Sequence, residues 1–313
     1  MQGLLVKSTG SSYTVYTDDG CLHECRIKGN FRIKGIKSTN PVAVGDIVEF
    51  TPSDNPANPS FITAIGDRRN YIIRRSSNLS KQSHILACNI DLCVLVVTIS
   101  HPETSPVFID RFLASAQAYR IPVLIYINKT DLLEGDDIRL AREFKKLYTS
   151  IGYQVLSGTA IDGTASSQLR EHIQGKMTLL AGNSGVGKST LINSLIPGID
   201  VRTGRISDKH DTGMHTTTFS EMYRMPDGGW ITDTPGIKGF GLYDMQPQEI
   251  SHYFTEIFQH SKECRYGNCT HVSEPGCAVK KAVEMGEISA SRYNSYLSML
   301  TDDDSDGKYR KME

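Results

Sequence analysis

The chain has 313 residues, of which 39% are hydrophobic and 22% are charged, and its formal net charge at pH 7 is −1. This length predicts two or three domains, and the composition is typical of a soluble globular protein with apolar cores. No apolar run approaches the roughly 18 residues that span a bilayer, so we expect no membrane partner. The near-zero net charge gives no indication of a nucleic-acid partner.

The first residues, 1–7, lack the basic start and apolar core of a signal peptide. The chain contains seven cysteines, and an odd number argues against a complete disulfide framework. Three of them lie close to His271 in the sequence, which favours metal binding in a reducing compartment. We therefore expect the protein in the cytoplasm.

Residues 1–70 are expected to form an all-β domain. Five segments with strand-like composition are separated by turn-forming residues, and they cover 4–6, 13–17, 21–27, 42–50 and 61–65. Five short strands in this length fit a small closed barrel such as an OB-fold. A basic stretch without an acid could follow an RNA backbone, although a solvated strand–loop face explains it as well; it comprises Arg26, Lys28, Arg32, Lys34 and Lys37.

Cys21, His23 and Cys25 alternate along the third of these segments, so on a strand their side chains face one side. No fourth ligand is near in sequence, and we interpret them as a small packed face rather than a metal site. The polar and basic segment 71–83 is interpreted as the linker to the next domain.

An α/β region begins after this linker. Residues 92–98 form a continuous apolar run of the kind found in parallel sheets, and residues 108–119 show helical periodicity. A second buried strand, 123–127, ends in Asn128-Lys129-Thr130-Asp131. This N-x-x-D spacing with lysine second is the guanine-reading motif of GTPases.

The residue types of this motif match guanine. The Asp131 carboxylate can accept hydrogen bonds from guanine N1–H and the exocyclic amine, which adenine does not offer. Asn128 can bond the other base edge, and the stem of Lys129 can lie over the ring. A site built for these donors leaves polar groups unpaired when adenine enters. Alone, four residues are weak evidence and a polar turn is the alternative.

A supporting loop follows the next expected strand. Residues 143–148 are predicted to be helical, 153–156 form a strand, and Ser157-Gly158-Thr159 then occupy the place of the base-supporting loop of GTPases. This loop usually reads Ser-Ala, so Gly158 departs slightly from the pattern.

The strongest signal is a phosphate-binding loop between a short buried strand, 177–181, and a helix that begins near Thr190. It reads G-x-x-x-x-G-K-S and consists of Gly182, Asn183, Ser184, Gly185, Val186, Gly187, Lys188 and Ser189. Its glycines let backbone N–H groups converge on phosphates, and the helix N-terminus adds positive partial charge. Lys188 is expected to reach the β- and γ-phosphates and Ser189 to hold Mg²⁺. With the base-reading motif, this loop predicts GTP and GDP as ligands.

Two switch segments follow. Asp233-Thr234-Pro235-Gly236 comes after a strand, so Asp233 can approach Mg²⁺ and the Gly236 N–H can sense the γ-phosphate. One threonine of 216–218, which we assign as Thr217 although the sequence does not decide it, is expected to close on Mg²⁺ when GTP is bound. Because the base-reading motifs precede the phosphate loop, the simplest account is a circularly permuted GTPase domain.

The last part of the chain contains a compact metal motif, formed by Cys264, Cys269, His271 and Cys277. Three thiolates and one imidazole complete a tetrahedral zinc site without a position for water, so the zinc is expected to be structural. Helices are expected at 247–260, 278–285 and 289–300, followed by a disordered tail from 301. Residues 245–313 carry 8 basic and 11 acidic side chains, a net charge of −3. RNA contacts of this domain are therefore expected to be local, or its contacts to be with protein.

Taken together, these motifs resemble the ribosome small-subunit-dependent GTPases of the RsgA/YjeQ family over essentially the whole chain. The matching segments are 128–131, 182–189, 213–218 and 233–242, together with the cysteine cluster. The resemblance implies an OB-fold RNA-binding domain (1–70), a circularly permuted GTPase domain (71–244) and a zinc-binding domain with a flexible tail (245–313). It further implies a monomeric bacterial enzyme that binds the small ribosomal subunit and its rRNA late in maturation, with hydrolysis stimulated by that subunit.

The water-orienting residue is expected to differ from that of common GTPases. Ile237 stands after Gly236 where a glutamine is common, and isoleucine cannot position water. His215 is the nearest polar candidate in a switch segment, and the resemblance points to it as catalytic; packing or bonding to backbone is the alternative. A nucleotide-gated RNA-binding scaffold with incidental hydrolysis stays open as the second function. A small-molecule kinase is disfavoured by the base-reading and switch motifs.

Overall fold

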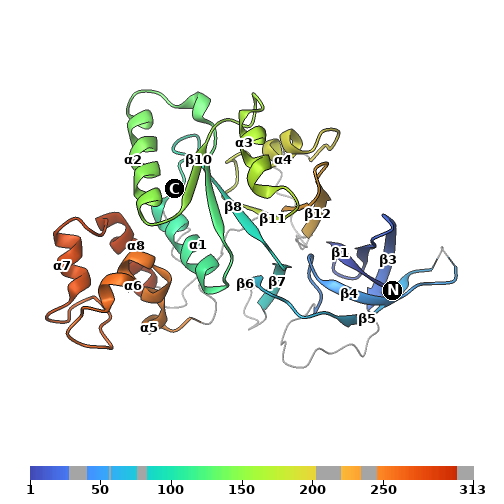
Figure 1. Ribbon diagram of the computed structural model, residues 1–313, viewed down its shortest axis with the longest axis horizontal. Coiled ribbons are helices and arrows are strands. Elements are labelled where there is room, and N and C mark those ends of the chain that lie inside the picture. The colour runs from blue at the N-terminus through green and yellow to red at the C-terminus, as the bar shows by residue number, and fades with distance from the viewer. Residues whose placement is uncertain (28–40, 56–57, 76–82, 202–219, 234–244, 302–313) are drawn as a thin grey trace, which may run out of the picture.

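Figure 1 shows the computed structural model, which describes residues 1–27, 41–55, 58–75, 83–201, 220–233 and 245–301. A β-barrel and a helical domain lie at opposite ends of a central α/β domain (Figure 1). Among the helices described, none combines the length and apolar character that a bilayer-spanning segment needs.

The N-terminal barrel is built from β1 (Gln2–Ser8), β2 (Tyr13–Tyr16), β3 (Leu22–Ile27), β4 (Ile47–Thr51) and β5 (Ser60–Ile65). The strands follow the order β1-β2-β3-β5-β4, and β4 pairs again with β1, which closes the barrel. Alternate side chains such as Leu5, Val15 and Ile62 are fully buried inside it, as the period of two requires. The predicted five-stranded OB-type barrel is confirmed.

The expected strand 42–50 begins only at Ile47. Asp46 forms a tight turn with Ala43, because its backbone N–H donates to the Ala43 carbonyl and its carboxylate accepts from the Ala43 N–H at 2.8 Å. Of the alternating side chains of β3, Cys25 is buried and the His23 ring packs on Phe50 with ring centroids 5.0 Å apart. Cys21 is exposed, so the packed face comprises two of the three residues.

The segment expected to be a linker contains a strand instead. β6 (Tyr71–Arg75) pairs antiparallel with β7 (Ser83–Cys88) in a separate two-stranded sheet. Ile72 is fully buried, and this side chain is what makes the segment part of a core despite its polar neighbours. Arg68 forms a bidentate ion pair with the fully buried Asp46, which also accepts from the Cys88 thiol at 3.0 Å. The barrel and the hairpin therefore share a buried polar junction.

The central domain is a sheet with helices on both faces. Its strands are β8 (Leu92–Val97), β9 (Val123–Ile127), β10 (Gln154–Ser157), β11 (Met177–Ala181), β12 (Ser220–Arg224) and β13 (Trp230–Asp233). They follow the order β10-β9-β8-β11-β13-β12, and all pairs are parallel except β12 with β13. One core packs under α1 (Pro106–Ala118) and α2 (Asp136–Ser150), and the other under α3 (Thr164–Ile173) and α4 (Lys188–Leu195).

The barrel is joined to this sheet without a break. β1 pairs antiparallel with β12, with Lys7 opposite Glu221, and their side chains form an ion pair at 2.9 Å. Beside this pairing, Tyr16 of the barrel packs edge-on against Trp230 of β13, with ring centroids 5.1 Å apart. Eleven strands thus form one continuous hydrogen-bonded sheet.

The C-terminal domain contains α5 (Pro247–Ile250), the 3₁₀ turn η2 (Ser251–Tyr253), α6 (Thr255–Ser261), α7 (Ala278–Glu284) and α8 (Ala290–Thr301). The single helix expected over 247–260 is interrupted at Phe254, whose backbone is extended (φ −105°, ψ 101°) and whose side chain is fully buried. Burial of this ring in the core of the domain overrides the helical pattern of the segment.

A buried ionic network fastens this domain to the α/β domain. Arg292 of α8 is 1% exposed and donates to Glu256 of α6 at 2.8 and 3.1 Å and to Asp110 of α1 at 2.8 Å. Tyr148 of α2 donates to the same Asp110 oxygen at 2.7 Å. Burial alone would lower the pKa of Arg292, but the charges of the two carboxylates raise it, so the guanidinium stays charged.

We predict that Arg292→Ala lowers the free energy of unfolding by about 3–5 kcal/mol, because it leaves two buried carboxylates without their cation. Urea unfolding followed by circular dichroism measures this loss. Arg139→Ala is the matched control, since Arg139 is 62% exposed in its ion pair with Glu143 and should cost less than about 1 kcal/mol. Equal losses in the two variants would contradict a stabilising role for the network.

Candidate nucleotide and metal sites

The predicted nucleotide-binding segments meet at one edge of the sheet. Strands β8, β9, β10, β11 and β13 run parallel, so the loops that follow them lie at the same carboxyl edge, where ligands of open α/β sheets bind. This edge carries the described members of the predicted site: Asn128, Lys129, Asp131, Ser157, Gly158, Gly182, Asn183, Ser184, Gly185, Val186, Gly187, Lys188, Ser189, Thr190 and Asp233. His215, Thr217 and Gly236 lie outside the described residues.

The phosphate loop connects β11 to α4, which begins at Lys188. Gly187 has φ +94°, and a Cβ atom there would lie 2.4 Å from Asn128 Nδ2, so only glycine fits between the two motifs. The Lys188 ammonium donates at 2.8 Å to the carbonyls of Gly182 and Asn183. The lysine therefore arches back over its own loop, where its charge lies among the backbone groups that would surround a phosphate.

Lys188 and Asp233 are half-buried, and their charges act on each other. Burial lowers the pKa of Lys188, and the nearby Asp233 charge opposes this shift. Burial also raises the pKa of Asp233, opposed by the Lys188 charge. Both shifts disfavour the charged forms. Each group would therefore be stabilised by a ligand charge opposite to its own, an anion at Lys188 and a cation at Asp233. The oxygen atoms of Ser189 and Asp233 are the hard donors that Mg²⁺ prefers, and the lysine suits a phosphate.

Asn128 holds three loops together. It is 2% exposed, its Nδ2 donates to the Val186 carbonyl in the phosphate loop at 2.8 Å, and its Oδ1 accepts from the Ala160 N–H at 3.1 Å. Its backbone N–H donates to the carbonyl of Val97, at the end of β8, at 2.8 Å. One N–H of the carboxamide remains for a base edge, so Asn128 acts first as a clamp between the phosphate and base loops.

The rest of the base-reading motif is arranged by a turn that sequence reasoning missed. Lys129 adopts a left-handed conformation (φ 59°), and its ammonium donates to the His101 carbonyl at 2.6 Å. His101 and Pro102 belong to the turn after β8, and Gly185 of the phosphate loop lies against Pro102. Asp131 is exposed in the short turn η1 (Thr130–Leu132), where its carboxylate is free to meet a ligand. The apolar run 92–98 predicted a parallel strand, and the turn that follows such a strand lies at the ligand-binding edge of the sheet; this was the available signal for the turn.

The departure at Gly158 has a physical cause. A Cβ atom at this position would lie 2.6 Å from the Tyr126 hydroxyl, which is buried and has no hydrogen-bond partner among the described residues. The Gly158 N–H donates to Ile127 at 3.0 Å, and its carbonyl accepts from Thr130 at 3.3 Å. The Tyr126 hydroxyl therefore occupies the space of the usual alanine side chain, at the loop predicted to support the base.

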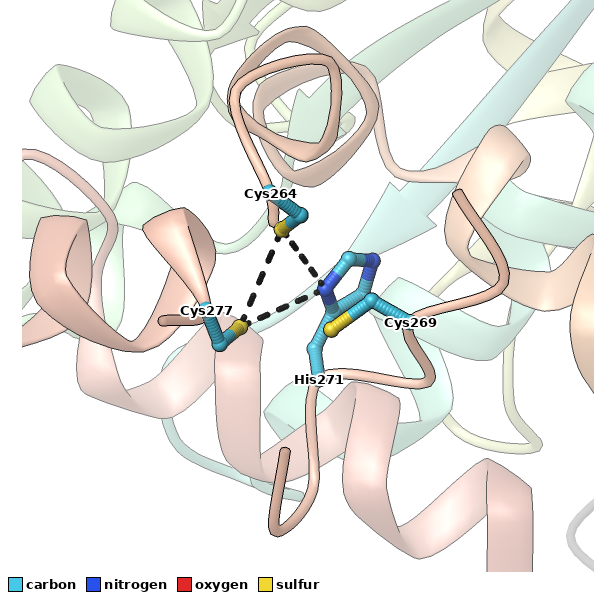
Figure 2. A group of neighbouring side chains, drawn as sticks. All are labelled: Cys264, Cys269, His271 and Cys277. Carbon is cyan, nitrogen blue, oxygen red and sulfur yellow. Dashed lines mark hydrogen bonds between the residues drawn. The ribbon is translucent and has the colours of Figure 1, made fainter. Parts of the chain in front are cut away.

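The four predicted metal ligands come together between α6 and α7. The thiols of Cys264, Cys269 and Cys277 and the imidazole of His271 offer ligand atoms within 4.8 Å of one another (Figure 2). His271 Nδ1 lies 3.6 Å from the Cys264 sulfur and 3.5 Å from the Cys277 sulfur. Figure 2 shows the side chains pointing toward a common centre. Three sulfurs and one nitrogen fit a tetrahedral soft-metal site.

The surrounding contacts hold these ligands in place. Burial raises the pKa of Cys269 to about 12 and lowers the pKa of His271, so a metal ion would displace thiol protons but find the imidazole neutral. Tyr293 donates to the His271 carbonyl at 2.5 Å, and Tyr296 donates to the Thr270 carbonyl at 2.7 Å. The metal loop is therefore anchored on α8.

Fold and site together define a GTPase whose GTPase domain is circularly permuted and is flanked by an N-terminal barrel and a C-terminal domain with a Cys₃His cluster. The family model for the RsgA GTPase matches residues 65–243, and that for the RsgA N-terminal domain matches residues 2–58. The chain belongs to the RsgA family of GTPases, whose members hydrolyse GTP.

Relatives match along nearly the entire chain. The small ribosomal subunit biogenesis GTPase RsgA of Bacteroides fragilis is 60% identical over 310 residues, which cover 99% of each chain. The protein of the same name from Porphyromonas gingivalis is 55% identical over 313 residues, again 99% of each. The crystal structure of YjeQ from Thermotoga maritima has a TM-score of 0.76 at 34% identity and 96% coverage of both chains. YloQ, described as a circularly permuted GTPase, has a TM-score of 0.72 at 29% identity, covering 100% of this chain and 96% of its own.

We predict that Gly158→Ala weakens GDP binding by about 5- to 150-fold, because overpacking against the Tyr126 hydroxyl costs about 1–3 kcal/mol and displaces the base loop. Tyr126→Phe alone should be nearly neutral, since this hydroxyl lacks a described partner. The double variant should regain most of the affinity, as measured by titration with a fluorescent GDP analogue. Equal affinities of the single Gly158→Ala variant and the double variant would show that the hydroxyl is not the obstacle.

Proposed function

We propose that this GTPase acts on the small ribosomal subunit late in its maturation and hydrolyses GTP to GDP and phosphate in a subunit-stimulated way. The proposal draws on the relatives named as small ribosomal subunit biogenesis GTPases, which match 99% of the chain. Contact with rRNA, residence in the cytoplasm and a monomeric state belong to the same proposal. The observation that carries it is the meeting of the base-reading and phosphate loops at one sheet edge through Asn128.

The residues have separate roles in this reaction. Lys188 binds the β- and γ-phosphates, Ser189 and Asp233 hold Mg²⁺, and Gly182–Ser189 backbone N–H groups surround the phosphate oxygens. Bound Mg²⁺ neutralises charge on the transferring phosphoryl group. Asp131, Asn128 and Lys129 select guanine, with Ser157 and Gly158 supporting the base. Thr217 and Gly236 respond to the γ-phosphate, and His215 orients the attacking water.

The competing function is a nucleotide-gated RNA-binding scaffold in which hydrolysis is incidental. Phosphate release measured with and without purified small subunits separates the two, because only the stimulated enzyme accelerates when subunits are added. We expect His215→Ala to retain GDP affinity and to lose the stimulated rate. Stimulated turnover that is unchanged in this variant would exclude His215 as the water-orienting residue, and no stimulation of the wild type would favour the scaffold.

We predict that Asp131→Asn changes the preferred base from guanine to xanthine. The carboxylate accepts from two N–H donors of guanine, whereas an asparagine presents one N–H₂ donor to the C2 carbonyl of xanthine. The affinity for GDP should fall by about 10²-fold or more, and the affinity for xanthosine diphosphate (XDP) should rise. The reason is that a carboxamide facing guanine, or a carboxylate facing xanthine, leaves a polar group unpaired. Competition binding with GDP, XDP and ADP measures this change. Asp136→Asn, on the exposed first turn of α2, is the control and should leave the order of affinities unchanged. An unchanged GDP preference in Asp131→Asn would remove this carboxylate from the base site.

We further propose that Cys264, Cys269, His271 and Cys277 hold one structural zinc ion. Their donor set fits zinc, and bound zinc would cross-link the loops between α6 and α7. Cys277→Ser should reduce the zinc content from about one ion per chain to nearly none and should destabilise the C-terminal domain. Cys21→Ser, at an exposed thiol on the barrel, should retain the metal. Metal analysis of purified protein and thermal unfolding with and without a chelator test the proposal, which full zinc content in Cys277→Ser would refute.

A further inference from the structure

A cavity lined by polar side chains lies beside the metal loop. Cys269 and His271 of the metal site form part of its wall, and its other lining residues belong to neither site described above. Its volume is about 260 Å³, and it opens between the α5–η2 segment and the loop that carries Cys269 and His271. No carboxylate is among the described residues that line it, and the lining includes Gln248, His252, Tyr266 and Asn268. The cavity therefore offers neutral hydrogen-bonding groups and ring surfaces rather than acidic ligands.

These groups are suited to the edge and the face of a nucleobase. The carboxamides of Gln248 and Asn268 each present a donor and an acceptor side by side, the combination that pairs with a base edge. The rings of Tyr266 and His252 provide faces on which an unstacked base can lie. Tyr266 is 41% exposed, so its ring is accessible to a ligand from solvent.

Two cations lie on aromatic side chains of the cavity wall or in contact with it. The Arg265 guanidinium lies 5.4 Å from the centroid of the Tyr266 ring, and the Lys262 ammonium lies 5.3 Å from that of Phe258. Phe258 in turn packs edge-on against His252, with ring centroids 5.0 Å apart. Lys262 and Arg265 thus place two positive charges directly next to the lining residues Ser261 and Tyr266 in the chain, and such charges suit the phosphates that flank an inserted base.

We propose that this cavity receives one unpaired RNA base, with Tyr266 stacking on it, the Gln248 and Asn268 carboxamides reading its edge, and Lys262 and Arg265 contacting the flanking phosphates. The proposal rests on the function proposed above, since it places the base in the RNA of the small subunit. It also reconciles RNA contact with the charge of −3 carried by residues 245–313, because a single base pocket needs only local positive charge. A protein side chain in the cavity is the opposing possibility, and the experiment distinguishes the two.

The test compares small subunits saturated with wild-type protein or with variants, using reagents that modify the Watson–Crick edges of unpaired bases. Wild-type protein should protect a base that becomes reactive again with Tyr266→Ala or with the double variant Gln248→Ala/Asn268→Ala. These variants should bind subunits about tenfold more weakly, the order expected for loss of one stacked base. Tyr266→Phe keeps the ring, and Met285→Ala changes an exposed side chain outside the cavity, so both should retain the protection. Identical protections in wild type and Tyr266→Ala would overturn the proposal.

A cross-linking arm does not depend on the stability of the alanine variants. The full chain carrying Tyr266→p-benzoylphenylalanine retains an aromatic ring, and its zinc content reports that the domain is folded. On irradiation with small subunits it should cross-link to RNA, whereas a cross-link to a ribosomal protein alone would refute the proposal. If the wild type does not bind subunits, the proposed function fails on its own account. Irradiation with an unstructured RNA oligomer then tests whether the cavity binds an unpaired base. Absence of a cross-link from position 266 to this RNA would refute the proposal.

Discussion

The nucleotide site depends on the hydrogen bonds of one buried carboxamide. Asn128 binds the phosphate loop through Val186, the base-supporting loop through Ala160, and the end of β8 through Val97. A buried carboxamide pays a desolvation cost unless its donor and acceptor are both satisfied, so these loops hold their relative positions for as long as the bonds persist. Gly187 lies so close to Nδ2 that no side chain fits between them. The predicted base-reading and phosphate loops consequently form one structural unit, although 58 residues separate Asn128 from Val186.

The two flanking domains are attached to different elements of this unit. The barrel extends the sheet through the β1–β12 pairing, next to β13, which ends at the predicted magnesium ligand Asp233. The helical domain is fixed through Arg292 to α1, the helix that follows the His101–Pro102 turn against the phosphate loop. Both attachments use contacts that are costly to break, strand pairing in one case and a buried ion network in the other. A partner that bound both domains would therefore act on elements that lead to the predicted nucleotide site.

Sequence patterns located those parts of the fold in which local chemistry and tertiary structure agree. The strand 123–127 has the predicted bounds, and the phosphate loop lies between β11 and α4 as its glycines required. The hairpin strand at Tyr71–Arg75 was missed, because its polar neighbours concealed one fully buried isoleucine that only the tertiary contacts explain. The helix break at Phe254 was missed for the same reason. Lys129 contacts a turn 28 residues earlier in the chain, and no local pattern encodes such a contact.

The permuted order has a mechanical consequence that follows from connectivity alone. In this chain β13 carries Asp233 at its end, and the segment containing Gly236 leads into the helical domain at α5. The segment containing His215 and Thr217 likewise leads into β12, the strand that pairs with the barrel. The segments proposed to respond to the γ-phosphate are thus the covalent connections to β12, which pairs with the barrel, and to α5, which begins the helical domain. Thr217 stands three residues before β12 and Gly236 eleven residues before α5, so a change at the γ-phosphate has a short covalent path to each outer domain. A GTPase domain permuted at this point therefore suits the proposed coupling of turnover to a large partner.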